Sequence, residues 1–123
     1  MYTPIAMDHF QNPRNAGELP DANAVGRASS GTHGVIFKLY LKIEGGKVAK
    51  AAFKTFGCGA AIAASSMLTE MVKGKTLEEL KGITNLKVNE ALGGLPPFKM
   101  HCANLAEEVL KAALDDFSRR KTS

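Results

Sequence analysis

The sequence predicts an α+β domain in which helices pack on one face of a small antiparallel β-sheet of about three strands. Strand-like alternation of apolar and polar residues occupies the first half of the chain, and helical periodicity begins after residue 59. Strands followed by helices are typical of α+β proteins rather than of alternating α/β folds. With 123 residues the chain can build one hydrophobic core, so we expect residues 1–123 to form a single domain.

The first half is expected to contain a short helix, a loop and a β-hairpin. Residues 5–11 can form a helix that ends at Asn12-Pro13, because proline disfavours a helical residue before it. The stretch to about residue 27 is rich in Gly, Pro, Asn and Asp and predicts a loop with room for one short strand, and residues 29–34 continue as a flexible loop. Residues 35–43 and 48–56 alternate as strands around a Gly45-Gly46 turn, which predicts an antiparallel hairpin.

The second half is expected to be helical. We predict helices over residues 60–73, 76–82 and 86–92, and from residue 101 or 102 to about 117. Gly74 is a helix stop, and Thr76 with Glu79 matches a capping box. Two prolines in the connector at residues 95–98 favour a rigid, extended shape.

The two cysteines, Cys58 and Cys102, each follow a loop and open a predicted helix. Free N–H groups and the dipole of a helix N-terminus favour thiolate over thiol, and thiolate is the form that binds iron or zinc. His101 is adjacent to Cys102, but neighbours on a helix diverge by about 100°. Both can therefore bind one metal if they lie in the turn before the helix. On the residues alone, Cys58 and Cys102 also fit the interpretation of small buried hydrophobic residues.

His33 lies in the loop before the first hairpin strand. The hairpin should bring this loop beside the loop after residue 56, so we expect His33 near Cys58. A histidine in a Gly/Ser loop is commonly only solvated, but imidazole is also a good ligand for zinc and iron. His9 falls in the first helix and is interpreted as structural or exposed.

Four segments carry a resemblance to the NifU/IscU-type iron–sulfur cluster assembly scaffold family (SufE/NifU-like fold). They are residues 9–17 (HFQNPRNAG), 54–63 (KTFGCGAAIA), 69–74 (TEMVKG) and 94–102 (GLPPFKMHC), in the order and spacing of the family. The similarity covers about residues 2–117. One departure concerns the Cys-Gly-Asp motif of the family, because here His33 stands at the cysteine and Val35 at the aspartate.

The resemblance implies the same α+β fold and a metal-ligand role for Cys58 and Cys102, with His101 as an occasional ligand and His33 in place of the missing cysteine. A set of two sulfurs and two nitrogens suits zinc and also a cluster with mixed ligands.

Two functions follow from the resemblance and this ligand set. One is a scaffold that binds iron, assembles a labile [2Fe–2S] cluster and transfers it to apo-proteins, without enzymatic turnover. The alternative is a stable zinc-binding or regulatory module, which the loss of the third cysteine favours.

The resemblance also implies partners. A cysteine desulfurase would supply sulfide, and recipient apo-proteins would take the cluster. The family's segment matching residues 95–99 can bind an Hsp70-type chaperone. Here Phe98 stands where chaperone-dependent members tend to have valine, so a plain connector is an equal interpretation.

Composition narrows the other possibilities. There are 16 basic and 12 acidic residues, a formal net charge of +4, without basic stripes interleaved with aromatics, so no nucleic-acid partner is expected. No apolar stretch has the length of a membrane span, so no membrane partner is expected either. Two cysteines without a disulfide framework fit a reducing, cytoplasmic location. We expect a monomer or a weak homo-oligomer.

Overall fold

A three-stranded antiparallel sheet forms one layer of the molecule. The computed structural model describes residues 2–122. The strands lie in the order β1-β2-β3, with bounds β1 (Ala24–Ser30), β2 (Val35–Glu44) and β3 (Lys47–Phe56). Ile36 lies opposite Phe56 in the β2–β3 ladder. Gly45 and Gly46 both have positive φ, as a tight hairpin turn requires. The predicted hairpin is confirmed.

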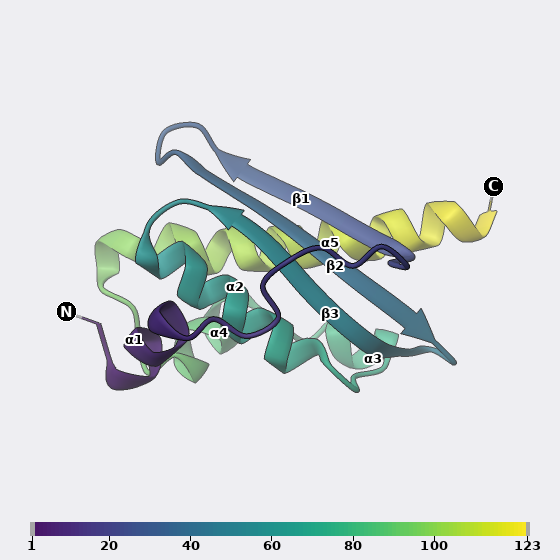
Figure 1. Ribbon diagram of the computed structural model, residues 1–123, viewed down its shortest axis with the longest axis horizontal. Helices are drawn as coiled ribbons and strands as arrows, with labels where there is room; N and C mark the ends of the chain where they lie inside the picture. The colour runs from purple at the N-terminus through teal and green to yellow at the C-terminus, as the bar shows by residue number, and fades with distance from the viewer. Residues whose placement is uncertain (1, 123) are drawn as a thin grey trace.

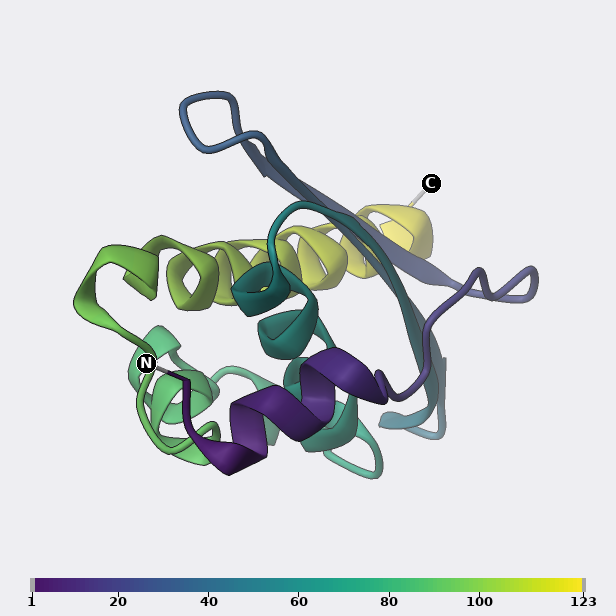
Figure 2. The ribbon, with the colours of Figure 1, turned by 60° about the vertical axis from the view of Figure 1, so that its left-hand side comes forward.

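The helices lie on one side of the sheet, as Figure 2 shows, and the predicted α+β class is confirmed. Their bounds are α1 (Pro4–Gln11), α2 (Gly59–Val72), α3 (Leu77–Leu80), α4 (Asn85–Ala91) and α5 (Met100–Thr122), with a 3₁₀ turn η1 (Pro97–Lys99) before α5. Helices α2 and α5 contact the strands directly, whereas α1 packs on α2. Phe37, Leu39 and Leu41 of β2 point into this interface and are almost fully buried. Burying such side chains contributes about 2 kcal/mol each.

Strand β1 is longer than the short strand predicted, because it includes Ser29 and Ser30, which were expected in a loop. Its small residues let α5 approach closely. A Cβ on Gly26 would lie 2.3 Å from the Val109 carbonyl oxygen and 2.5 Å from the Ala113 nitrogen of α5. Packing against a helix, rather than alternation in the sequence, therefore determines this strand.

The entry into α5 also differs from the prediction. Pro96 is extended, with φ −54° and ψ 143°, but Pro97–Lys99 forms a 3₁₀ turn that leads directly into α5 at Met100. His101 and Cys102 therefore both lie inside the helix and not in a turn before it. The helix also continues to Thr122, beyond the expected end near residue 117.

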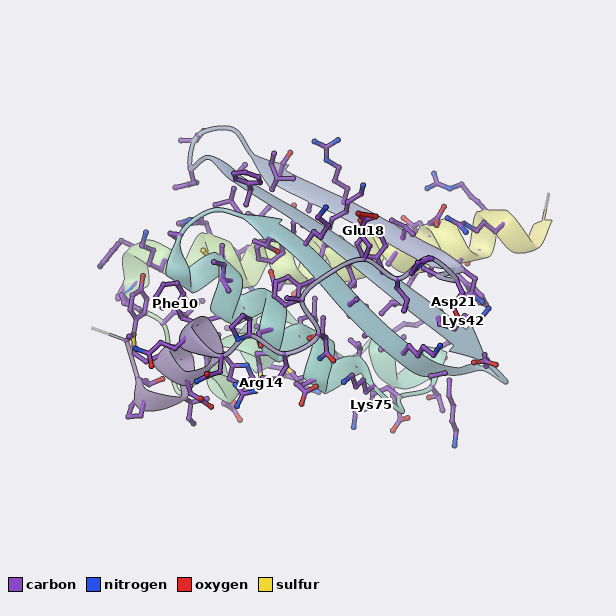
Figure 3. All side chains as sticks on the ribbon, viewed as in Figure 1. Phe10, Arg14, Glu18, Asp21, Lys42 and Lys75 are labelled. Atoms are coloured by element: carbon purple, nitrogen blue, oxygen red, sulfur yellow. The ribbon has the colours of Figure 1, made fainter. Side chains whose placement is uncertain are left out.

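The linker between α1 and β1 runs over the open face of the sheet, where Figure 3 labels Glu18 and Asp21. Backbone hydrogen bonds join Asn15 and Gly17 of this linker to Phe53 of β3. Glu18 and Asp21 form exposed ion pairs with Lys54 and Lys50, at 3.3 and 3.4 Å. Exposed pairs of this kind contribute little to stability, so the backbone bonds are the principal attachment.

Within residues 2–122, no helix is long and apolar enough to cross a membrane.

Candidate metal site

Three chain segments meet at one end of the molecule. They are the β1–β2 loop that carries His33, the β3–α2 connection that carries Cys58, and the start of α5 with His101 and Cys102 (Figure 1). The β2–β3 register brings the first two segments to the same end of the sheet. Figure 3 labels Phe10 at this end, where its ring lies against Gly59.

Cys58 is the N-cap residue of α2 and is half-buried. The glycines beside it permit close packing. Gly57 has φ +151°, and a Cβ there would lie 3.1 Å from a methyl group of Val35, while a Cβ on Gly59 would lie 3.1 Å from the Phe10 ring. Larger residues at these two positions would displace the loop that presents the sulfur.

The Cys58 sulfur lies in an electropositive setting. Burial on its own would raise the pKa of this thiol. The N–H groups of Ala61 and Ala60, the Lys99 ammonium and the Cys102 thiol outweigh burial and lower the pKa below its ordinary value. The sulfur makes no standard capping hydrogen bond, so the two N–H groups act as longer-range stabilisers of the thiolate.

Cys102 is fully buried in the first turns of α5, and its thiol lies close enough to Cys58 for each to affect the pKa of the other. Burial, followed by the interaction with Cys58, raises the pKa of Cys102 to about 12. The two thiols therefore differ in acidity: Cys58 is the more acidic of the pair, and Cys102 keeps its proton at neutral pH.

Lys99 is the cation of the site. Attraction to the Cys58 sulfur raises the pKa of its ammonium group. Because Lys99 closes the 3₁₀ turn just before α5, the same connector that positions Cys102 also places this charge.

The two histidines form a second pair. The rings of His33 and His101 are stacked, with centroids 3.7 Å apart and planes inclined by 10°. His33 Nδ1 lies 2.9 Å from the Ser30 hydroxyl, and a ring nitrogen of His101 bonds to the Phe98 backbone. Burial, followed by the neighbouring His33 and Lys99, lowers the pKa of His101. The lowered pKa favours the neutral imidazole, which is the form that binds metals.

Comparison with known proteins identifies the family. A family model described as the NifU-like N terminal domain matches residues 1–123. The chain belongs to this family. It is 50% identical over 120 residues to an iron–sulfur cluster assembly scaffold protein IscU of Archaeoglobus fulgidus, covering 98% of the chain and 78% of that protein. It is 44% identical to the IscU scaffold of Azotobacter vinelandii, covering 98% and 96%.

Solved structures share the NifU-like fold. A scaffold protein of the SUF system from Fervidobacterium islandicum superposes with a TM-score of 0.75 at 22% identity, covering 92% of the chain and 96% of that structure. The N-terminal part of a NifU-like protein from Brucella abortus gives a TM-score of 0.70 at 19% identity, covering 96% and 94%. At these identities the likeness establishes the fold.

Within this NifU-like fold, the four sequence-predicted site residues come together as two pairs. Cys58 lies close to Cys102, and the His33 ring is stacked on the His101 ring. Among the described residues, no three His, Cys, Asp or Glu side chains are grouped so as to hold one metal ion. His9 has a structural role, as predicted, because it is buried and its Nδ1 lies 2.8 Å from the Ser66 hydroxyl.

Sequence reasoning missed two residues of the site, Lys99 and Ser30. Lys99 stands three residues before Cys102, where a cation next to a predicted helix start was a usable signal. Ser30 was assigned to a flexible loop, and nothing in the local sequence indicated that it would contact the His33 ring.

Proposed function

We propose that this chain is a scaffold on which an iron–sulfur cluster is assembled and from which it is passed to recipient proteins. The observation that carries the proposal is the proximity of Cys58 and Cys102 to each other and to Lys99 in a NifU-like domain. The relatives named as cluster assembly scaffolds support it. The role is that of a carrier, with the cluster as cargo, rather than of an enzyme.

The residues divide the work by protonation state. Cys58, the more acidic thiol, is the first sulfur available to incoming iron. Cys102 becomes a ligand only when its proton leaves, so loading of the site releases a proton. Lys99 holds the negative charge of Cys58 until iron replaces it. Its ammonium then neutralises part of the negative charge that thiolates and sulfide bring.

We infer a [2Fe–2S] cluster with His33, Cys58, His101 and Cys102 as the protein ligands. Thiolate and imidazole are both ligand types that the irons of such clusters accept. A structural zinc site requires a single closed group of four ligands, and among the described residues not even three such side chains are grouped around one point. The zinc-module alternative is therefore not favoured.

The proposed partners follow from the cargo. A cysteine desulfurase would deliver sulfide, and apo-proteins would receive the cluster, in a reducing cytoplasm where both thiols stay free. The single domain of residues 1–123 would act as a monomer or a weak homo-oligomer. Leu95 and Pro96 are buried in the connector, whereas Phe98 is 73% exposed. Phe98 is thus the available contact if an Hsp70-type chaperone binds there.

Anaerobic reconstitution tests the proposal. The purified protein is incubated with ferrous iron, cysteine, a cysteine desulfurase and dithiothreitol, which reduces the sulfane sulfur from the desulfurase to sulfide, and iron, acid-labile sulfide and visible absorption are measured. Transfer is then followed by adding an apo-ferredoxin. We expect iron and sulfide in equal amounts and loss of the cluster to the acceptor.

Cys58→Ala and Cys102→Ala should each abolish stoichiometric cluster binding, with the far-ultraviolet circular dichroism unchanged. Ser29→Ala, in β1 beside the site loop, is the matched control and should bind normally. A wild-type protein that takes up zinc but no iron and sulfide would refute the proposal.

A further inference from the structure

The open face of the sheet, opposite the helices in Figure 2, carries a row of cations that crosses all three strands. The strand register places Arg27 of β1 opposite Lys38 of β2, and Lys38 opposite Lys54 of β3. All three residues are exposed. Like charges directly opposite each other on neighbouring strands destabilise a sheet. This row therefore has a cost in stability that the packing of the fold does not require.

Only Lys54 in this row has a carboxylate partner. Its Nζ lies 3.3 Å from Glu18 of the linker. Within the described part of the chain, Arg27 and Lys38 form no ion pair, and Lys38 Nζ lies 5.8 Å from the centroid of the Tyr40 ring. Lysines on edge strands commonly prevent sheets from pairing edge to edge. Lys38 lies on the central strand, so this explanation does not apply to it.

An exposed apolar pair adjoins the row of cations. Ile36 of β2 and Phe56 of β3 lie opposite each other, and they are 39% and 79% exposed. Two open grooves, of about 570 and 270 Å³, meet at this pair. Side chains that share a face of a strand are two residues apart, so roughly 7 Å separates the apolar pair from the row of cations.

The linker between α1 and β1 shows what kind of segment this face accepts. It forms one side of the larger groove through Gly17 and Glu18. Glu18 and Asp21, both labelled in Figure 3, place carboxylates 3.3 Å from Lys54 and 3.4 Å from Lys50. An acidic segment of the chain itself thus covers the cations of β3, whereas the cations of β1 and β2 remain open to another molecule.

We propose that this part of the sheet binds an extended acidic segment of a partner protein. The surface, here called the basic–apolar face, consists of Arg27, Ile36, Lys38 and Phe56. Acidic side chains of the partner would lie on the two cations, as Glu18 lies on Lys54, and a bulky apolar side chain would cover the apolar pair.

The geometry also sets the spacing within the partner segment. Alternate side chains of an extended segment repeat at roughly 7 Å, which is the distance between the two rows. The segment should therefore carry an acidic residue two positions from a large apolar one. The basic–apolar face contains no candidate metal ligand, so it is independent of the proposed scaffold function. Since Phe56 precedes Cys58 by two residues, a partner bound there would lie beside the metal site.

Fluorescence anisotropy of a labelled peptide tests the proposal with the full chain at low salt, where exposed charges are least screened. The probe is fluorescein-labelled GEEFEEG. We expect saturable binding that weakens as salt is added. The neutral peptide GQQFQQG should bind at least about tenfold more weakly, because it cannot pair with the two cations. The peptide GEEAEEG should also bind more weakly, because it lacks the apolar side chain.

The discriminating variant is Lys38→Glu, which should weaken binding of the acidic peptide at least about tenfold through like-charge repulsion. Its urea midpoint should stay the same or rise, because a carboxylate then lies between Arg27 and Lys54. Lys87→Glu on α4 is the matched control, since it changes the net charge equally at another exposed lysine and should bind as the wild type does. Phe56→Ala should weaken binding of GEEFEEG but not of GEEAEEG.

Several outcomes would overturn the proposal. Equal binding by Lys38→Glu and the wild type, or an equal loss in Lys87→Glu, would show that the basic–apolar face is not the site. Tighter binding of a labelled oligothymidylate than of the peptide would indicate a nucleic-acid surface. Self-association that Lys38→Glu abolishes would indicate a second copy of the chain as the occupant. A lower urea midpoint for Lys38→Glu would show that the lysine has a structural role.

Discussion

The two thiols of the site should differ sharply in reactivity, and a disulfide reagent such as dithionitrobenzoate measures the difference directly. Cys58 is half-buried with a lowered pKa, whereas Cys102 is fully buried with a pKa raised to about 12. Only the thiolate attacks the reagent. We therefore expect one fast and one slow thiol, with Cys58 as the fast one.

The structure sets a lower bound on the rate ratio. At about pH 8, a pKa of about 12 leaves roughly one Cys102 in 10⁴ as thiolate. The pKa of Cys58 is below 9.0, so at least about one Cys58 in ten is thiolate. The ratio of thiolate fractions is at least ~10³. The weaker nucleophilicity of a more acidic thiol reduces it by roughly 20- to 30-fold. A rate ratio of at least ~30 remains, and burial of Cys102 increases it.

Single-cysteine variants assign the phases. Cys102→Ala should keep the fast phase. Cys58→Ala should leave a slow thiol, because burial is the largest cause of the raised Cys102 pKa and is unchanged by this substitution. Lys99→Met should slow the reaction of Cys58, and Lys87→Met, a change of another exposed lysine, should not.

Rates for the two thiols within fivefold of each other would refute this account of the site. So would a fast Cys102 in the Cys58→Ala variant, since it would mean that burial does not control its proton.

Three further predictions concern the fold and the site. Gly26→Ala should destabilise the protein by about 3 kcal/mol, because its methyl group would meet the backbone of α5, whereas Gly31→Ala has open space and should change the urea midpoint little. Val35→Asp would bury a carboxylate under the Gly57 loop, so we expect a less stable protein that loses a bound cluster faster in air. Equal cluster decay rates in the wild type and the variant would contradict this. Cobalt binding at neutral pH should release at least one proton, from Cys102, and should weaken as pH falls because protons compete with the metal for the thiolate. Calorimetry in buffers of different ionisation enthalpy measures the number of protons released.

Local chemistry in the sequence was sufficient for much of the fold. The alternation around Gly45-Gly46 predicted the hairpin, and the capping box of Thr76 and Glu79 is present as expected. Gly74 follows the end of α2 with a positive φ. Such signals act over a few residues, so they can be recognised without knowing what packs against them.

Strand β1 and the start of α5 were predicted less well, because their boundaries depend on distant partners. Small residues around Gly26 resemble a loop until the close approach of α5 is known. Two prolines predicted an extended connector, yet Pro97 begins a 3₁₀ turn, a position that proline's fixed φ also permits.

For the site, the sequence by itself determined the candidate ligands and their placement beside loops and helix starts. It could not determine which ligand meets which. Only the tertiary structure pairs Cys58 with Cys102 and His33 with His101, and only the structure adds Lys99 and Ser30. The reason is physical. Pairing and pKa depend on through-space distance and burial, which are set when the sheet end, α2 and α5 pack together, whereas a motif records only neighbours along the chain.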